Sequence, residues 1–202
     1  LLNDVVVTQS IGKTRETPVA MSTIDAEQLE FKLGNSELLE VLKTTPGVYT
    51  RSEGGGWGDA KTRVRGFESE NVAMLINGIP VNDQEWGGVY MSNWAGLAEV
   101  ASSIQTQRGL GATMLSTPSI GGTINITTRT IDVKKGGSVW YGMGNDGMNQ
   151  FGVKLSTGLM KNGWAVTILG SRKWADGYIQ GTNYDAYNWF VNVTKRINDQ
   201  HQ

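Results

Sequence analysis

An Asn77-Gly78 dipeptide joins two apolar runs, and this junction limits the fold more than any other feature of the chain. Both residue types tolerate positive φ, which a two-residue type I′ hairpin requires at its two central positions. The dipeptide therefore predicts that residues 72–76 pair with residues 79–82 as antiparallel strands. Pro80 has no N–H group to donate, so we expect it at a sheet edge or at the start of a strand.

Two arginines lie just upstream in a further predicted strand. Residues two apart in a strand point to the same face, so Arg63 and Arg65 should share one face while Thr62 and Val64 share the other. Neighbouring guanidinium groups need carboxylates or water opposite them. A solvated strand face is one interpretation of this pair, and contact with an acidic surface is the other.

The sequence of this region resembles a known family. Residues 63–67 read Arg-Val-Arg-Gly-Phe and residues 75–83 read Leu-Ile-Asn-Gly-Ile-Pro-Val-Asn-Asp, and both are similar to the plug domain of TonB-dependent outer-membrane receptors. Residues 46–48, 108–109 and 119–129 also resemble plug motifs, in the same order along the chain. The resemblance extends over residues 4–129. It departs from the family where acidic residues usually precede the Arg-Gly pair, since Ser102 and Gln105 stand there.

A β-branched run near the start of the chain has two interpretations. It consists of Asp4, Val5, Val6, Val7 and Thr8. Such runs usually form an ordinary strand. This one also resembles the TonB box of the family, although Gln9 stands where the family has alanine. The resemblance implies that the C-terminal domain of TonB binds these residues as an added strand.

Between these motifs the sequence predicts a strand over residues 20–24 and two short helices. Asp25, with Gln28 three residues later, forms a capping-box pattern at the start of a helix that ends at Gly34. A second helix is predicted from residue 35 or 36 to Thr45, with four apolar residues directed to a core. We therefore expect a TonB-box-like segment at residues 1–10 and an α+β plug at residues 11–135, built from a small mixed sheet with flanking helices.

Two loops are candidates for substrate binding. Residues 51–59 are rich in glycine but lack the Gly-Lys-Ser/Thr sequence of a phosphate loop. Residues 82–94 are rich in aromatic and hydrogen-bonding side chains. An ordinary surface loop is the alternative for each, whereas the resemblance implies that both point into the outer cavity of a barrel. The candidate substrate contacts are Trp57, Asp59, Asp83, Glu85, Trp86, Tyr90 and Trp94.

Apolar and polar residues alternate through residues 136–202. The apolar rows are Val139, Tyr141 and Met143; Phe151, Val153, Leu155 and Leu159; Trp164, Val166 and Ile168; and Tyr187, Trp189, Val191 and Val193. Such segments have about the length of a membrane-crossing strand, ~9–11 residues, and the alternation is typical of an outer-membrane barrel. A soluble β-sandwich uses the same alternation. The turns favour the barrel, because tight turns at residues 161–163 and 198–200 flank a longer polar loop at residues 175–186.

The expected fold class is thus an α+β plug domain followed by the start of an antiparallel transmembrane β-barrel. Residues 136–202 have room for about four strands, whereas a plugged transporter barrel has about 22. Four strands cannot close a barrel, so we expect the chain to be part of a larger receptor. The sequence also contains neither a signal peptide nor an apolar run of ~18 residues.

Composition argues against several kinds of chemistry. The 18 Lys and Arg residues balance 19 Asp and Glu residues, which leaves no basic surface for nucleic acid. Cysteine is absent, and the one histidine is His201, so we expect no thiolate chemistry, no catalytic triad, no metal site and no cofactor. Asp83 and Glu85 would be the carboxylates of a glycosidase, but neighbouring loop residues give no defined separation. We therefore do not expect an enzyme.

The resemblance implies TonB-dependent import of a scarce nutrient across the outer membrane, with an iron chelate, a corrinoid or an oligosaccharide as substrate. Arg63, Arg65 and Arg108 would hold the plug against carboxylates of the barrel wall. The implied partners are TonB, outer-membrane lipid, the substrate and a surface lipoprotein, and nucleic acid is not among them. The alternative is a secreted β-rich carbohydrate-binding or adhesive module without transport activity.

Overall fold

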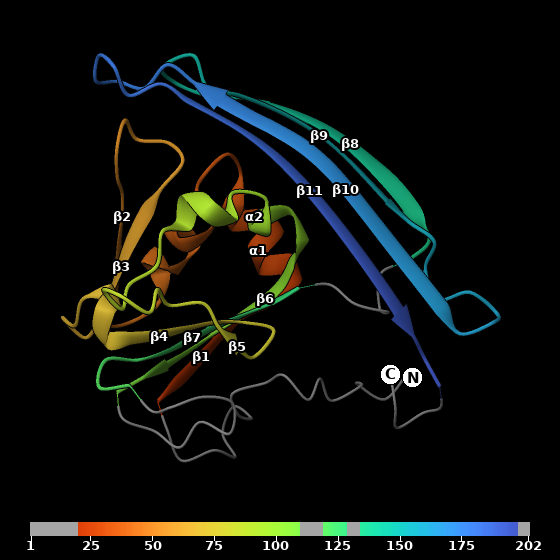
Figure 1. Cartoon of the computed structure of the whole chain (residues 1–202), viewed down its shortest axis with the longest axis horizontal. Coiled ribbons are helices and arrows are strands. Elements are labelled where there is room, and N and C mark those ends of the chain that lie inside the picture. The colour runs from red at the N-terminus through yellow and green to blue at the C-terminus, as the bar shows by residue number, and fades with distance from the viewer. Residues whose placement is uncertain (1–19, 110–118, 129–133, 198–202) are drawn as a thin grey trace.

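The computed structural model describes residues 20–109, 119–128 and 134–197, which form two parts (Figure 1). The first part, the α/β unit, contains a five-stranded sheet, a separate strand pair and several short helices. The second part, the C-terminal sheet, is a long antiparallel sheet of four strands. It curves alongside the α/β unit, which lies on its concave side (Figure 1).

The five-stranded sheet has the order β1-β6-β7-β4-β5. Its strands are β1 (Met21–Ile24), β6 (Ala101–Arg108), β7 (Gly122–Thr128), β4 (Val72–Ile76) and β5 (Ile79–Pro80). The β4 and β7 strands run parallel, and the other neighbouring pairs run antiparallel. This arrangement confirms the predicted small mixed sheet.

The predicted hairpin is present between β4 and β5. Asn77 and Gly78 have φ values of 52° and 80°, and Ile76 pairs with Ile79. Pro80 lies on the edge strand, as predicted. The second strand is shorter than predicted, because the side chain of Asn82 takes over the pairing: its Oδ1 accepts from the Met74 N–H (2.7 Å), and its Nδ2 donates to the Val72 carbonyl (3.0 Å).

The first predicted helix is α1 (Ala26–Leu33), which begins where the Asp25 side chain accepts a hydrogen bond from the Gln28 N–H (2.9 Å). The second is a 3₁₀ helix, η1 (Leu38–Thr44), so the start predicted at residue 35 or 36 is wrong. Asn35 does not cap η1, because its side-chain amide instead binds the C-terminal sheet. The remaining helices are the short η2 (Ser69–Asn71), η3 (Met91–Trp94) and α2 (Leu97–Val100).

The arginine motif lies at the end of a separate strand pair, β2 (Val48–Ser52) and β3 (Ala60–Val64). Thr62 and Val64 are buried and Arg63 is exposed, as the alternation predicts. Arg65 does not continue the strand, and the prediction that it does is wrong. Its φ of 55° turns the chain, so that the Phe67 N–H reaches back to the Val64 carbonyl (3.0 Å).

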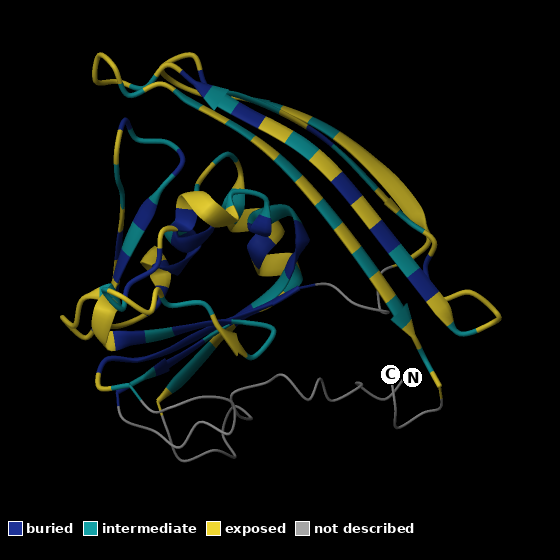
Figure 2. Ribbon diagram, in the orientation of Figure 1, coloured by how far each residue is buried: buried dark blue, intermediate teal, exposed yellow. Residues whose placement is uncertain are grey.

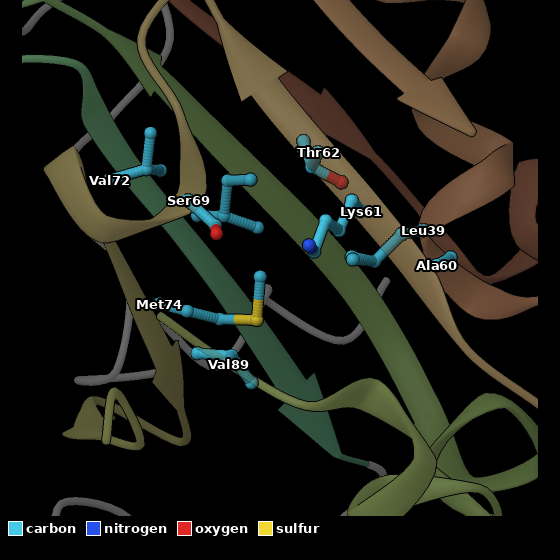
Figure 3. A pocket seen from close by; sticks show the side chains of 9 residues that line it. Leu39, Ala60, Lys61, Thr62, Ser69, Val72, Met74 and Val89 are labelled. Atoms are coloured by element: carbon cyan, nitrogen blue, oxygen red, sulfur yellow. The ribbon is translucent and has the colours of Figure 1, made fainter. Parts of the chain in front are cut away.

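The core of the α/β unit lies between the five-stranded sheet, the β2–β3 pair and η1 (Figure 2). The four apolar residues that were predicted to face a core are all buried: Leu38, Leu39, Val41 and Leu42. Figure 3 shows side chains of η1, β3 and β4 converging on a cavity of about 10 Å³. This volume is about enough for one water molecule, so this cavity has no room for a ligand.

The C-terminal sheet has the order β11-β10-β9-β8. Its strands are β8 (Gly136–Met143), β9 (Asn149–Ser156), β10 (Trp164–Ala175) and β11 (Tyr184–Lys195). The predicted alternation is confirmed on β10 and β11, where outward and inward residues differ in exposure along the whole strand (Figure 2). Its outer face carries exposed apolar side chains that include Tyr141, Phe151, Ile168, Trp189 and Val191.

The tight turn predicted at residues 161–163 and the longer loop before Tyr184 are both observed. The turn predicted at residues 198–200 and the TonB-box-like residues 4–8 lie outside the described residues. No helix in the described part of the chain has the length and apolar character needed to cross a membrane.

Candidate functional site

The two candidate substrate loops meet at Asp59. Its Oδ1 accepts hydrogen bonds from the Ala60 N–H (2.8 Å) in its own loop and from the Met91 N–H (3.0 Å) at the end of the other loop. Burial raises the pKa of this carboxyl, and the two backbone donors work against that shift. Asp59 therefore links the two loops through these hydrogen bonds.

Asp83 organises the second loop. Its Oδ1 accepts from the backbone N–H groups of Glu85 (2.8 Å) and Trp86 (3.1 Å), and its own N–H donates to the Gly88 carbonyl (2.8 Å). These bonds close a compact turn in which the Asp83 and Glu85 side chains remain exposed. Both carboxylates are thus presented on one loop, where a polar ligand can reach them.

Trp86 and Tyr90 form an aromatic pair beside this turn. Their ring centroids lie 5.1 Å apart with an interplanar angle of 51°. Tyr90 is 52% exposed, whereas Trp86 is half-buried and packs over Gly88. The Trp86 Nε1 donor is buried and has no hydrogen-bond partner among the described residues. The exposed ring of Tyr90 is the feature of this pair that suits an organic ligand.

Trp94 lies on a different surface from the Asp83 turn. It lines a cavity of about 390 Å³ between η3, α2 and the strands β10 and β11. Side-chain amides share this cavity with the ring of Phe190, and these amides belong to Asn77, Asn93 and Asn188. The structure therefore does not bring all seven predicted contacts into one pocket.

Trp57 also has a different environment from the one that the sequence suggests. Its ring packs against the C-terminal sheet, with the Lys173 Nζ 5.3 Å from the ring centroid. A Cβ atom added at Gly144, after β8, would lie 3.2 Å from the Trp57 ring. This indole contacts the sheet, and Asp83, Glu85, Trp86 and Tyr90 remain as a cluster on one loop.

A polar contact between the two parts was missed by the sequence reasoning. Lys173 of β10 donates to Glu37 Oε1 (2.6 Å), and the two side chains are only 9% and 13% exposed. Asn35 donates through Nδ2 to the Met143 carbonyl (2.6 Å) and accepts from Gln150 Nε2 (3.0 Å). One signal for this contact is present in the sequence, because Lys173 occupies an inward position of an alternating strand.

Glu99 of α2 lies close enough to Lys173 and Glu37 for their charges to affect its carboxyl group. Its Oε2 is buried and accepts no hydrogen bond from the described residues. Burial raises the pKa of the Glu99 carboxyl, the charge of Lys173 lowers it, and the charge of Glu37 raises it further. The α/β unit thus presents two carboxylates to one buried lysine of the C-terminal sheet.

Glycines of the first loop allow the α/β unit to approach the C-terminal sheet closely. A Cβ atom at Gly58 would overlap the ring of Tyr184 on β11, and one at Gly55 would overlap Thr182 in the loop before β11. The Tyr178 N–H also donates to the Gly55 carbonyl (3.2 Å). The glycine-rich first loop is therefore held against the sheet.

Of the three arginines that were expected to contact wall carboxylates, Arg63 and Arg108 have other partners among the described residues. Arg63 forms an ion pair with Glu68, and Arg108 Nη1 donates to the Pro46 carbonyl (2.9 Å). Arg65 Nη1 lies close to Gly109, where an added Cβ atom would be 2.5 Å away. Contact between these arginines and a barrel wall stays a prediction. In the described ranges, no group of three His, Cys, Asp or Glu side chains is placed to hold a metal ion.

Comparison with known proteins identifies the family of the α/β unit. The family model of the TonB-dependent Receptor Plug Domain matches residues 13–123, which is more than half of the chain. Over 189 residues the chain is 25% identical to the vitamin B12 transporter BtuB of Vibrio vulnificus (strain CMCP6), which covers 90% of the chain and 30% of the relative. It is 27% identical to the ferric enterobactin receptor of Pseudomonas aeruginosa over 146 residues, covering 66% of the chain and 19% of that receptor.

Solved structures agree with this assignment. The structure of P. aeruginosa FpvA bound to heterologous pyoverdines superposes with a TM-score of 0.74 at 16% identity, covering 95% of this chain and 25% of FpvA. At this identity the similarity establishes the fold. The chain spans less than a third of the length of the curated relatives it matches.

Proposed function

Because the chain belongs to the plug-domain family of TonB-dependent receptors, we propose that it serves in the TonB-dependent import of a scarce nutrient across the bacterial outer membrane. The α/β unit is the plug, within residues 11–135, and residues 1–10 carry the segment that TonB binds. The C-terminal sheet, within residues 136–202, is the first part of the barrel wall that surrounds the plug.

The observation that carries this proposal is the contrast between the two faces of the C-terminal sheet. The inner face holds the α/β unit through buried polar contacts such as Lys173–Glu37. The outer face exposes a row of apolar side chains on every strand, including Val139, Phe151, Ile168 and Val191. A sheet whose inner face makes polar contacts with an enclosed domain and whose exposed outer face is apolar matches the wall of an outer-membrane barrel.

Aromatic and basic side chains mark both ends of this outer face, which supports contact with lipid. Near one end, the Arg172 guanidinium lies 4.8 Å from the Trp174 ring centroid and 4.9 Å from that of Tyr187. Near the other end, the Lys195 Nζ lies 5.2 Å from the Trp164 ring centroid. Amphipathic rings of this kind are favoured at the two boundaries of a bilayer.

The substrate classes that we favour are corrinoids and ferric siderophores. Relatives are a vitamin B12 transporter and a ferric enterobactin receptor, and the proposal extends their chemistry to this chain. The exposed cluster of Asp83, Glu85, Trp86 and Tyr90 is the first candidate contact surface. Trp94, with its amide-lined cavity, is the second. Trp57 and Asp59 would contribute by positioning the first loop.

Uptake experiments test the proposed function. The whole receptor is expressed in an outer membrane that lacks other receptors for cobalamin and ferric enterobactin, and entry of each radiolabelled compound is measured with and without TonB. We expect uptake of one of them that requires TonB, and no uptake after deletion of residues 4–8, because TonB then has no strand to pair with. Binding of the compound to the cell surface should survive the deletion.

Two results would contradict the proposal. If uptake is equally fast without TonB, transport by this receptor is not coupled to TonB. A receptor that is recovered in the culture medium, binds an oligosaccharide and transports nothing would favour the secreted module instead. The comparisons give that alternative no support, since the relatives are transporters and receptors.

A further inference from the structure

We propose that Lys173 is a latch that holds the plug against the wall, and that it must release Glu37 before the plug can open. This inference rests on the proposed function, because it assigns the two parts their roles as plug and wall. The latch consists of Lys173 on β10 and of Asn35 and Glu37 in the turn before η1. No inference from the sequence predicts a contact between these positions.

The ammonium group of Lys173 has three close neighbours in the α/β unit. Its Nζ lies 2.6 Å from Glu37 Oε1 and 3.4 Å from the Asn35 carbonyl oxygen, and 5.3 Å from the centre of the Trp57 ring. Its side chain is 9% exposed. A lysine that is withdrawn from water in this way depends on its anionic partner, so separation of plug and wall leaves two unpaired charges in a poorly solvated space.

Glu37 connects the latch to the first candidate loop. The same Oε1 that accepts from Lys173 also accepts from the Gly58 N–H, at 3.1 Å. One carboxylate oxygen therefore joins three segments, which are the turn before η1, the glycine loop and β10. A displacement of the glycine loop changes the position of the Lys173 partner, so the loop and the latch move together.

A second polar contact supports the same turn without carrying charge. Asn35 donates to the Met143 carbonyl at the end of β8 and accepts from Gln150 on β9. These bonds bring the turn to the strands next to β10. The Glu37–Lys173 ion pair joins the α/β unit to the C-terminal sheet, and both side chains are largely withdrawn from water, so its loss should be measurable.

A buried thiol in the plug reports how often the plug opens. Thr62 on β3 is suitable, because it is 3% exposed and its hydroxyl has no hydrogen-bond partner among the described residues, so Thr62→Cys removes no bond. The chain contains no other cysteine. The rate of maleimide labelling of this thiol is measured in outer-membrane vesicles that contain the whole receptor. Any other cysteine of the receptor is first replaced.

The matched pair of variants is Lys173→Met and Arg172→Met. Both remove one positive charge from adjacent positions of β10, but Arg172 faces outward and pairs with Asp185 at 2.9 Å. We expect Lys173→Met to raise the labelling rate at least tenfold and Arg172→Met to leave it unchanged. Equal rates in the two variants would overturn the proposal.

A double-mutant cycle separates the latch from general damage to the fold. If Lys173 and Glu37 act as one pair, Lys173→Met and Glu37→Leu together should accelerate labelling no more than the stronger of the two single changes, because the double change leaves no unpaired buried charge. Effects that multiply would overturn the proposal. If Lys173→Met prevents assembly, Lys173→Gln takes its place in the cycle, and the same two outcomes decide.

Failure of this inference can be distinguished from failure of the proposed function. If Lys173→Met does not change the labelling rate and the receptor still shows TonB-dependent uptake, the latch proposal is rejected and the proposed function is not. A receptor without TonB-dependent uptake, in which Lys173→Met still accelerates labelling, rejects the transport role and leaves the contact between the two parts intact.

Discussion

At the scale of single residues, glycines decide how closely the plug approaches the C-terminal sheet. Gly58 has a φ of 92°, and its missing side chain leaves room for the ring of Tyr184. Its N–H group also binds the latch carboxylate of Glu37. An L-residue at this position would be strained in its backbone and would also displace an aromatic ring.

The first prediction concerns Gly58→Ala. We expect it to lower the free energy of plug unfolding by about 2–4 kcal/mol, because backbone strain of about 1 kcal/mol is added to a steric overlap. Gly54→Ala is the matched control, since Gly54 has a φ of 60° but no atom within 4 Å of an added Cβ. Denaturant unfolding, followed through labelling of the buried thiol at position 62, provides the measurement.

The comparison of the two glycines separates strain from contact. Gly54→Ala should cause only the backbone part of the loss. If the two variants are equally destabilised, the Tyr184 contact contributes nothing, and the loop does not depend on the C-terminal sheet for its position.

At the scale of secondary-structure elements, the strands β10 and β11 each separate two environments over 12 residues. Ala165, Leu169 and Lys173 are buried on the inner side of β10, whereas Ile168 and Arg172 are exposed on the outer side. The register pairs Ile168 with Val191, so the apolar rows of the two strands lie next to each other. In water such an exposed apolar surface would promote aggregation, whereas in a bilayer its contact with lipid is favourable.

The second prediction concerns Val191→Arg, on the outer face of β11, where Val191 is 56% exposed. If this face contacts lipid, the charge should destabilise the assembled receptor by up to about 2–4 kcal/mol, depending on depth. The effect is measured as the amount of receptor in the outer membrane that stays folded on heating. Val191→Leu, which keeps the side chain apolar, should behave like the unmodified chain.

This prediction discriminates between the two functions considered. On the surface of a secreted module, an arginine at an exposed strand position would change stability by less than about 0.5 kcal/mol. Normal assembly of Val191→Arg would therefore contradict the placement of β11 in a membrane.

At the scale of the whole molecule, charges of both signs lie where the plug meets the C-terminal sheet. Lys173 and Lys154 of the C-terminal sheet and Glu37 of the plug all act on the Glu99 carboxyl, whose Oε2 accepts no hydrogen bond from the residues described. An acid whose pKa is raised by burial favours its protonated form in the folded state. The folded state therefore loses stability as the pH rises from the ordinary value of 4.5 through the raised pKa of Glu99.

The third prediction concerns Glu99→Gln, which cannot ionise. Relative to the unmodified receptor, this variant should be similarly stable near pH 4 and should gain stability as the pH rises, until Glu99 is fully ionised in the folded state. Unfolding midpoints measured from about pH 4 to about pH 8 test the sign. A stability difference that is independent of pH would show that Glu99 is solvated in the docked state.

The sequence alone was sufficient to predict the local features of this fold. The Asn77-Gly78 turn follows from φ preferences of two adjacent residues, and the faces of β10 and β11 follow from a period of two, so neither depends on distant parts of the chain. The motifs around Arg63 and Gly78 were also sufficient for the family, because their order along the chain is itself informative.

Tertiary structure alone decided which side chains meet. Lys173 and Glu37 are 136 positions apart, and no local preference relates them; their contact exists because the sheet curves around the plug. The same holds for Trp57, whose ring lies against the sheet, and for Asp59, which joins two loops. Backbone conformation is set by neighbours in sequence, whereas charge pairing and burial are set by neighbours in space, and only the folded chain specifies those.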